Sequence, residues 1–330
     1  MCCLYCRLLS SSWQLALAVV LLCLGAGAQA ASFTVANPYA SSTSTTDITI
    51  RKLFVFGDSY SRAGRKTWHN WAEQLRYDAI NSKAKLPAAR ALVDVAVGAA
   101  TGGIYPAFTN DFAHQATSWL AVKRTFDPHD LTIVYFGYND FNRSTLTDGV
   151  DLARAVTDYN GVLQRLIKTN VGASGRRILL ILPHDWGHTP YHAARGQSEV
   201  MRQRTRIWND LVAKLAYQST YRNFIAVDLF TAMDCVFRQP SDFGFVDVGS
   251  SRPLNANPSQ YLYDYNDPYH FAERGQTLIR QVVQYYLTRG WDWANTIKEP
   301  EAARQKLLAE LRAGNMFPVK CAADPAPSPG

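Results

Sequence analysis

Short, nearly continuous apolar runs alternate with longer amphipathic stretches along most of the chain. The runs consist largely of aliphatic, β-branched and aromatic residues, which is typical of parallel strands covered on both faces. Three of them are followed directly by glycine, which indicates a turn. The five candidate strands are residues 52–56, 91–97, 131–136, 177–182 and 223–229.

The longer stretches predict helices on the basis of their hydrophobic spacing. The four candidates are residues 67–80, 151–170, 198–220 and 272–290. In the second, six apolar side chains fall on one face: Leu152, Val156, Tyr159, Leu163, Leu166 and Ile167. Alternation of strands and helices implies right-handed crossovers. The sequence therefore predicts an α/β protein, a three-layer α/β/α sandwich with a central five-stranded parallel sheet.

The two ends of the chain differ from this pattern. Residues 1–30 combine a short start carrying one basic residue, the apolar run WQLALAVVLLCL and the small residues GAGAQA, as a secretory signal peptide does. The run is too short for a membrane helix, which needs about 20 residues. We predict a secreted, extracellular protein without stable membrane insertion, with a flexible leader (31–50), a folded domain (51–297) and a C-terminal helix and tail (298–330).

Charge and cysteine content refine this prediction. Removing the signal peptide takes away one basic residue, Arg7, and changes the formal net charge from +7 to +6. The remaining basic residues are scattered, so they indicate a solvated surface and no nucleic-acid partner. Only Cys235 and Cys321 lie beyond the signal peptide. In an oxidising compartment these two cysteines are expected to form a disulfide.

Candidate chemistry follows the predicted strands, where ligands gather in a doubly wound sheet. Four short segments stand at such positions or just before the last long helix: Gly57-Asp58-Ser59-Tyr60, Gly98-Ala99-Ala100, Gly137-Tyr138-Asn139-Asp140 and Asp267-Pro268-Tyr269-His270. Together they contain a hydroxyl, an imidazole, carboxylates and an amide, which are the groups that acyl transfer uses.

A serine hydroxyl becomes a good nucleophile when an imidazole takes its proton, and a carboxylate fixes the imidazole tautomer. Ser59, His270 and Asp267 are the candidates for these three roles. Asp264 and Asp247 are the competing carboxylates. We favour Asp267 because the three-residue spacing brings it to the same side of a tight turn as His270.

The tetrahedral intermediate of acyl transfer needs hydrogen-bond donors for its oxyanion. The backbone N–H groups of Ser59 and Gly98 and the side-chain amide of Asn139 are the predicted donors. Glycine at position 98 leaves no Cβ to crowd the oxyanion. Asp58 and Asp140 are predicted to shape turns by accepting backbone hydrogen bonds.

In their order along residues 51–290, the blocks GDSY, the glycine after the second strand, GYND and DPYH resemble those of the SGNH hydrolases, also called the GDSL esterase/lipase family. VFGDSY, TWHNWAEQL and AVGAATGG are similar to the secreted fungal carbohydrate acetylesterases within it. The resemblance implies a flavodoxin-like fold and carboxylic ester hydrolysis without a cofactor. Two departures are Tyr60, where leucine is usual, and Ala99, where a second glycine is usual. An α/β-hydrolase is disfavoured because the chain lacks the G-x-S-x-G motif.

Further residues carry weaker signals. Tyr60, Tyr138 and Trp186 are candidates for a substrate pocket, with Trp186 either stacking on a sugar or packing in the interior. Three histidines recur at a spacing of four, as metal ligands on a helix would: His184, His188 and His192. Gly187 and Pro190 interrupt any such helix, so we predict no metal. Asn142-Arg143-Ser144 is an N-glycosylation acceptor pattern.

The sequence thus predicts a monomeric serine esterase acting on acylated small molecules or oligosaccharides, with acetyl on plant oligosaccharides as the expected ester. A lipase of the same family acting on longer acyl chains is one alternative. A carbohydrate-binding or surface protein that kept the fold without turnover is another. Acyl chain length and the catalytic need for Ser59 separate these three.

Overall fold

The computed structural model describes most of the predicted folded domain. The described residues are 52–64, 68–81, 91–106, 108–122, 130–144, 149–168, 177–218 and 224–289. The predicted signal peptide, leader and C-terminal segment (1–30, 31–50 and 298–330) lie outside these ranges, so they stay predictions.

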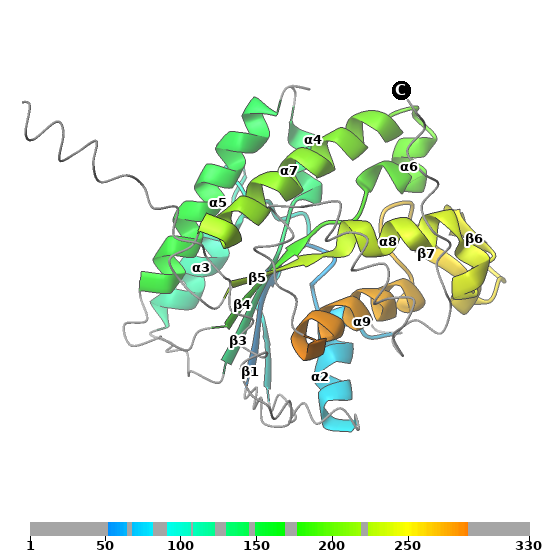
Figure 1. The fold of residues 1–330 in the computed structure, drawn as a ribbon, viewed down its shortest axis with the longest axis horizontal. Helices are drawn as coiled ribbons and strands as arrows, with labels where there is room; N and C mark the ends of the chain where they lie inside the picture. Colours follow the sequence, from blue (N-terminus) through cyan, green and yellow to red (C-terminus); the bar gives the residue numbers. More distant parts are fainter. Residues whose placement is uncertain are drawn as a thin grey trace, which may run out of the picture. The chain divides into compact units, whose positions relative to one another are not determined.

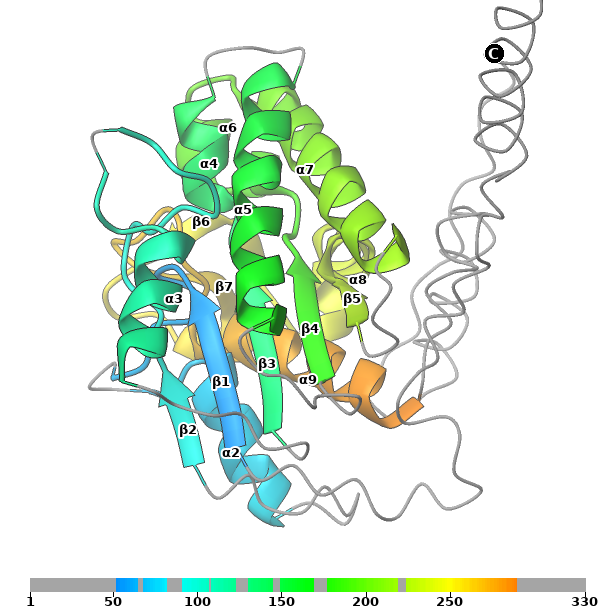
Figure 2. The same ribbon diagram turned by 90° about the vertical axis from the view of Figure 1, so that its left-hand side faces the viewer.

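Five parallel strands form the central sheet, in the order β2-β1-β3-β4-β5 (Figures 1 and 2). The strands are β1 Lys52–Gly57, β2 Ala91–Asp94, β3 Asp130–Tyr135, β4 Arg177–Leu182 and β5 Phe224–Asp228. This is the strand order of flavodoxin-like folds. The predicted five-stranded parallel sheet is confirmed.

The inner strands are buried along almost their whole length, which explains their continuous apolar sequences. All six residues of β3 are buried, as are all of β1 except Lys52. The two strands pair in register from Lys52 opposite Asp130 to Gly57 opposite Tyr135. Because both strands end at the same level, the segments that follow them, residues 58–60 and 136–139, begin side by side at one edge of the sheet.

Helices cover both faces of the sheet and complete the predicted three layers (Figures 1 and 2). One face carries α3 Phe112–Ala121, α5 Val150–Lys168 and α7 Ser198–Gln218, and the other carries α2 Trp71–Asn81 and α9 Glu273–Arg289. The six residues predicted for the inner face of α5 are all buried. Among the described helices, none is both long and apolar enough to cross a bilayer.

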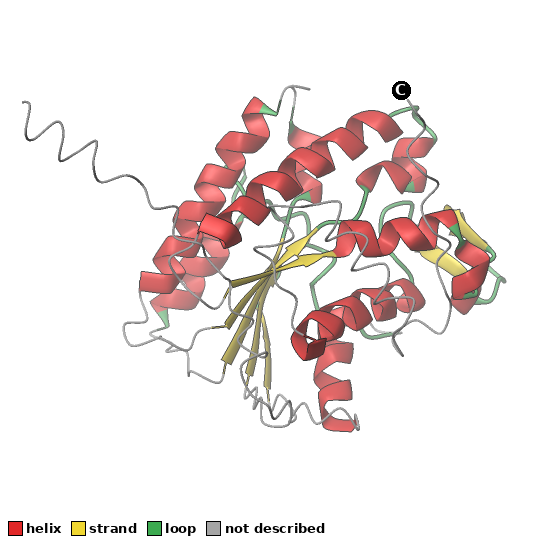
Figure 3. Ribbon diagram, viewed as in Figure 1, coloured by secondary structure: helices red, strands yellow, loops and turns green. Residues whose placement is uncertain are grey.

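Several elements were not predicted from the sequence (Figure 3). They are α3, α4 Tyr138–Arg143, α6 Pro190–Ala193, α8 Leu229–Arg238 and the parallel pair β6 Asp247–Arg252 and β7 Tyr261–Tyr265. Helix α8 begins directly after β5, where the strand had been expected to extend to residue 229. The reason is a helix cap, because the Asp228 carboxylate accepts a hydrogen bond from the Thr231 N–H at 2.9 Å.

Candidate active site

Ser59, His270 and Asp267 form one chain of hydrogen bonds at the carboxyl end of the sheet. Ser59 Oγ lies 2.7 Å from His270 Nε2. On the other side of the ring, His270 Nδ1 lies 2.8 Å from Asp267 Oδ2 and 3.0 Å from Oδ1. A hydroxyl, an imidazole and a carboxylate in this order are the arrangement that activates a serine nucleophile.

The tight turn before α9 positions both the carboxylate and the imidazole. Asp267 Oδ1 accepts hydrogen bonds from the backbone N–H groups of Tyr269 and His270, each at 3.0 Å. Burial alone would raise the pKa of Asp267, but these bonds and the His270 ring hold its pKa below the ordinary value. The carboxylate is therefore ionised at neutral pH, as orientation of an imidazole requires.

The competing carboxylates of the sequence analysis are engaged elsewhere. Asp264 lies 3.8 Å from the guanidinium of Arg252 and accepts the Tyr265 N–H. Asp247 accepts the N–H groups of Gly249 and Ser250 in β6. The His270 ring is hydrogen-bonded to Ser59 and Asp267, so Asp267 is the carboxylate that orients it.

Tyr60, next to Ser59, ties the nucleophile turn to the histidine turn. Its hydroxyl donates a hydrogen bond to the Tyr269 carbonyl. Its ring centroid lies 5.2 Å from that of His270, and the side chain is 1% exposed. A buried tyrosine normally finds a partner for its hydroxyl. Here that partner is the backbone beside His270, so Tyr60 links two turns that are 209 positions apart along the chain.

Gln115 on α3 holds the end of β1 in place, and the sequence analysis did not identify it. Its side-chain amide donates to the Gly57 carbonyl at 2.8 Å and accepts from the Gly57 N–H at 3.1 Å. A Cβ at position 57 would lie 2.7 Å from Ser61 Oγ and 2.9 Å from the Tyr135 carbonyl oxygen. Glycine is therefore required at the residue that delivers Asp58 and Ser59.

Asp58 shapes the nucleophile turn, as predicted. Its Oδ1 accepts the Tyr60 N–H at 2.9 Å, which is an Asx-type turn. The side chain is 1% exposed, and Oδ2 has no hydrogen-bond partner among the described residues. Burial raises the pKa of Asp58 to about 8. The carboxyl group is therefore largely protonated at neutral pH and differs in charge from Asp267.

Asp58→Asn is expected to stabilise the protein between pH 7 and 8 and to flatten its stability across pH 4 to 8. The pKa of Asp58 is raised in the folded state. Its contribution to the free energy of unfolding is therefore fully present below about pH 4 and is lost as the pH rises through about 8. Asparagine imitates the protonated acid at every pH. Thermal unfolding followed by circular dichroism should show Tm higher by about 3 °C or more at pH 8, with little change at pH 4. A variant Tm below the wild-type value at pH 8 would contradict this assignment of the protonation state.

The predicted oxyanion donors lie on the segments after the two strands that flank the nucleophile. Gly98 follows β2, and Asn139 lies on α4 after β3, next to the segments of Gly57 and Ser59. One N–H of the Asn139 amide donates to the Ala100 carbonyl at 2.8 Å. This bond fixes the amide and joins the two donor segments. Gly98 and Asn139 are both half-buried, so a substrate that enters the site can reach them.

The turn after β2 has a strained residue where the related family usually has glycine. Ala99 adopts a φ of 60°, which costs a residue with a Cβ about 1 kcal/mol or more. The neighbouring Gly98 is less constrained in the free protein, because a Cβ there would meet only the Arg62 guanidinium, at 3.5 Å. Any need for glycine at position 98 therefore arises only with a substrate bound.

Asp140 stabilises the same region from the opposite side. Its two carboxylate oxygens accept the N–H groups of Gly102 and Gly103, at 2.9 and 3.0 Å. Burial raises the pKa of Asp140 to about 6, against the opposing effect of these two bonds. Its role is structural, as predicted, but it holds the loop after β2 and not its own turn.

The predicted substrate pocket needs correction. Tyr60, Tyr138 and Trp186 are 1%, 1% and 3% exposed. They pack against one another beneath the triad, with the Tyr138 and Trp186 rings stacked at 4.3 Å. Their position after strands suggested accessibility, but their rings are buried in the aromatic interior. They support the floor of the site and do not line a pocket open to substrate.

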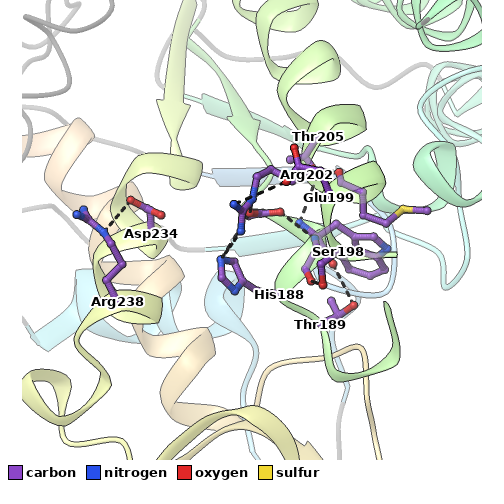
Figure 4. Close-up of polar contacts among 12 residues, drawn as sticks. His188, Thr189, Ser198, Glu199, Arg202, Thr205, Asp234 and Arg238 are labelled. Atoms are coloured by element: carbon purple, nitrogen blue, oxygen red, sulfur yellow. Dashed lines mark hydrogen bonds and ion pairs between the residues drawn. The ribbon is translucent and has the colours of Figure 1, made fainter. Parts of the chain in front are cut away.

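The three spaced histidines are engaged separately and do not converge. His184 is fully buried and hydrogen-bonded to the Tyr138 hydroxyl, and His192 Nδ1 lies 2.9 Å from Gln197 Oε1. His188 belongs to a polar cluster between η1 Trp186–His188, α7 and α8, where Arg202 lies 3.3 Å from its Nε2 (Figure 4). Across the described part of the chain, no group of three ligating side chains could hold a metal ion.

Two further predicted sites are a glycosylated asparagine and a disulfide. Asn142 is exposed on α4, three residues beyond Asn139. Cys235 is buried on α8. Its predicted partner, Cys321, lies outside the described residues, so the disulfide stays a prediction.

The fold and the site define a class of protein, a hydrolase of α/β architecture with a serine, a histidine and an aspartate at the carboxyl ends of its strands. The sequence model of the GDSL-like lipase/acylhydrolase family matches residues 53–283. The chain belongs to this family and is a carboxylic ester hydrolase. An acylated compound is therefore its substrate.

Comparison with solved structures finds enzymes of related description. An α/β-hydrolase from the metagenome of Lake Arreo is 17% identical, with 73% of this chain and 96% of the other covered and a TM-score of 0.45. A lipolytic G-D-S-L protein from Veillonella parvula is 14% identical (72% and 98% covered, TM-score 0.45). A catalytic mutant of an acetylxylan esterase from Geobacillus stearothermophilus is 13% identical (74% and 96% covered, TM-score 0.45). No curated protein matches the sequence. The family assignment therefore rests on the family model.

Proposed function

We propose that this protein is a secreted serine esterase that removes short acyl groups, acetyl in particular, from plant-derived oligosaccharides. The observation that carries the proposal is the unbroken hydrogen-bond chain from Ser59 Oγ through His270 to Asp267. Donors suited to an oxyanion flank this chain on two neighbouring segments. Ester hydrolysis by double displacement needs these parts and no metal or nucleotide.

In the acylation half of the proposed cycle, His270 Nε2 takes the Ser59 hydroxyl proton as Oγ attacks the ester carbonyl carbon. The carbonyl oxygen gains negative charge, and the N–H groups of Ser59 and Gly98 and the Asn139 amide donate to it. Asp267 stabilises the imidazolium without taking its proton. When the C–O bond to the alcohol breaks, His270 Nε2 protonates the leaving oxygen and an acyl-serine remains.

Deacylation repeats these steps with water as the nucleophile. His270 Nε2 removes a proton from water, and the resulting hydroxide attacks the acyl-serine carbonyl. Collapse of the second tetrahedral intermediate breaks the bond to Ser59 Oγ, which regains the proton held by His270. The products are one carboxylic acid and the free enzyme.

Packing beneath the triad supports a short acyl group. Tyr60, Tyr138 and Trp186 fill the volume directly below the nucleophile turn and are at most 3% exposed. A close-packed protein interior does not admit a long alkyl chain without displacing side chains. An acetyl group needs no such space.

A lipolytic activity on longer acyl chains is the second candidate, and one observation favours it. A groove of about 410 Å³ lies between the end of β2 and α3. Its lining includes the apolar side chains of Val95, Val97, Trp119 and Val122, and the other lining residues are polar. Val97 directly precedes Gly98, so the groove begins beside a proposed oxyanion donor. A chain extending from the acyl carbonyl in that direction would be partly covered.

A chain-length series of 4-nitrophenyl esters, from acetate to palmitate, separates these candidates. We expect kcat/KM to be highest for acetate and to fall at least about tenfold beyond butyrate, because the site below Ser59 is filled. Val122→Trp, which adds bulk to the groove at the end away from Gly98, is the matched control. If the enzyme prefers short acyl groups, this variant should leave the dependence of kcat/KM on acyl chain length unchanged. If long esters are preferred and this variant shifts the preference to short ones, the lipolytic candidate is correct.

Secretion, the disulfide between Cys235 and Cys321, glycosylation of Asn142 and the monomeric state belong to the same proposal. The exposure of Asn142 supports the glycan, because an acceptor asparagine must be accessible. The position of Asn142 on the helix that carries Asn139 would place such a glycan at the mouth of the site.

A further inference from the structure

We propose that Tyr191, Tyr269 and Arg195 form a platform that binds the sugar part of the substrate on the leaving-group side of the triad. This inference rests on the proposed ester hydrolysis and identifies residues that select the alcohol. We refer to these three residues as the tyrosine platform.

The chemistry of the triad determines on which side the alcohol lies. His270 Nε2 takes the proton from Ser59 and returns it to the leaving oxygen, so that oxygen must come within hydrogen-bond reach of Nε2. The carbonyl oxygen is bound on the other side, toward Gly98 and Asn139. The alcohol part of an ester therefore extends past the side chains that neighbour His270.

Tyr269 immediately precedes His270, and its ring centroid lies 6.4 Å from the imidazole. The Tyr191 ring lies 4.5 Å from that of Tyr269 at 33°, and the Arg195 guanidinium lies 3.5 Å above the Tyr191 ring. Trp186 lies on the interior side, its ring 6.2 Å from that of Tyr269. The stack thus runs from the buried floor of the site to solvent, where Tyr191 and Tyr269 are half-buried and Arg195 is exposed.

The platform is fixed to the triad through the backbone. Tyr191 N–H donates to the Pro268 carbonyl at 3.3 Å, within the turn that holds Asp267 and His270. The Tyr269 carbonyl accepts the Tyr60 hydroxyl beside the nucleophile. A ligand on the platform would therefore be held at a constant position relative to Ser59, as a substrate-selecting surface requires.

The exposed chemistry of the platform suits a polyhydroxylated ring. Guanidinium N–H groups and phenol hydroxyls are the groups that donate hydrogen bonds to sugar oxygens. Because Tyr269 and Arg195 pack on the Tyr191 ring, a sugar would meet these polar groups and the edges of the rings. Burial, with the hydrogen bond to Tyr191, raises the pKa of Tyr269 to about 12, so this phenol stays uncharged well above neutral pH. A long alkyl alcohol offers no further oxygens for these groups to bind.

The test compares two acetyl esters within each variant, monoacetylated xylotriose and ethyl acetate. The readout is the ratio of kcat/KM for the sugar ester to kcat/KM for ethyl acetate, which cancels any general effect on the triad. We expect Tyr191→Ala to lower this ratio about tenfold, mainly through KM for the sugar ester, and Arg195→Ala to lower it about threefold. Tyr265→Ala is the matched control, because this 45% exposed tyrosine also has a guanidinium, that of Arg252, 5.7 Å from its ring.

Binding provides the second measurement, in protein that cannot turn over. Titration calorimetry of Ser59→Ala with monoacetylated xylotriose should give a Kd about tenfold weaker when Tyr191→Ala is added. If both rates fall together and the ratio stays constant, Tyr191 supports only the turn and the proposal is wrong. The proposal is also wrong if the wild type hydrolyses ethyl acetate but adding Tyr191→Ala to Ser59→Ala leaves the Kd of the sugar ester unchanged. If wild-type protein hydrolyses neither ester, the proposed acetyl specificity itself fails.

Discussion

Replacing Ser59 by alanine is expected to lower kcat for short-chain esters by about 10⁴-fold or more. Without Oγ no acyl-enzyme forms, and His270 has no hydroxyl to deprotonate. The remaining rate is what the oxyanion donors and substrate binding supply to direct attack by water. If the wild type hydrolyses the ester and Ser59→Ala binds it without hydrolysis, this chain is not a non-catalytic carbohydrate-binding protein.

The matched control lies in the same turn. Ser61 is fully buried, and its Oγ has no hydrogen-bond partner among the described residues. Ser61→Ala should therefore keep the wild-type kcat within about threefold. Intact-mass measurement after treatment with a fluorophosphonate gives a second readout, with one adduct expected in wild type and Ser61→Ala and none in Ser59→Ala. Ser59→Ala retaining a tenth of the activity would show that another nucleophile acts.

The sheet was predictable because burial on both faces makes the sequence of a strand nearly continuously apolar. β1 and β3 show this directly, and their sequences leave little alternative. α3 was missed because it is short and its buried face includes a glutamine, Gln115. α8 was missed because Asp228 ends a strand and begins a helix in the same step, leaving no loop residues to separate the two.

The candidate site was predictable as far as it depends on residue type and chain order. Ser59, His270 and Asp267 were identified from the chemistry that each side chain can do, and the structure brings the three together. The clamp of Gln115 on Gly57 joins residues 58 positions apart and has no local signal. The supposed pocket of Tyr60, Tyr138 and Trp186 was wrong because proximity to the end of a strand does not determine whether a ring points into the interior or to solvent.

Replacing Asp267 by asparagine is expected to lower kcat by about 10³- to 10⁴-fold while the fold is retained. Asparagine keeps an oxygen that can accept the N–H groups of Tyr269 and His270, so the turn should persist. Its NH₂ group would donate to His270 Nδ1, which places the ring proton on Nε2. The imidazole would then donate to Ser59 Oγ and could not take its proton.

Stability supplies an independent readout for the same variant. The pKa of Asp267 is lowered in the folded state, so its ionised form contributes stability above about pH 4 that is lost as the pH falls through the lower, folded-state value. Asp267→Asn should therefore lower Tm at pH 7 and reduce the loss of Tm on acidification. A mere unfolding effect would instead lower Tm equally at every pH.

Asp264→Asn is the matched control for this prediction, because Asp264 was the competing carboxylate three residues before Asp267. It lies beside Arg252, and its own N–H donates to the His270 carbonyl, a bond that the substitution leaves in place. We expect kcat within about threefold of wild type. If Asp264→Asn abolished activity and Asp267→Asn did not, the hydrogen bonds to His270 Nδ1 would have to rearrange when substrate binds, and the third member of the triad would be Asp264.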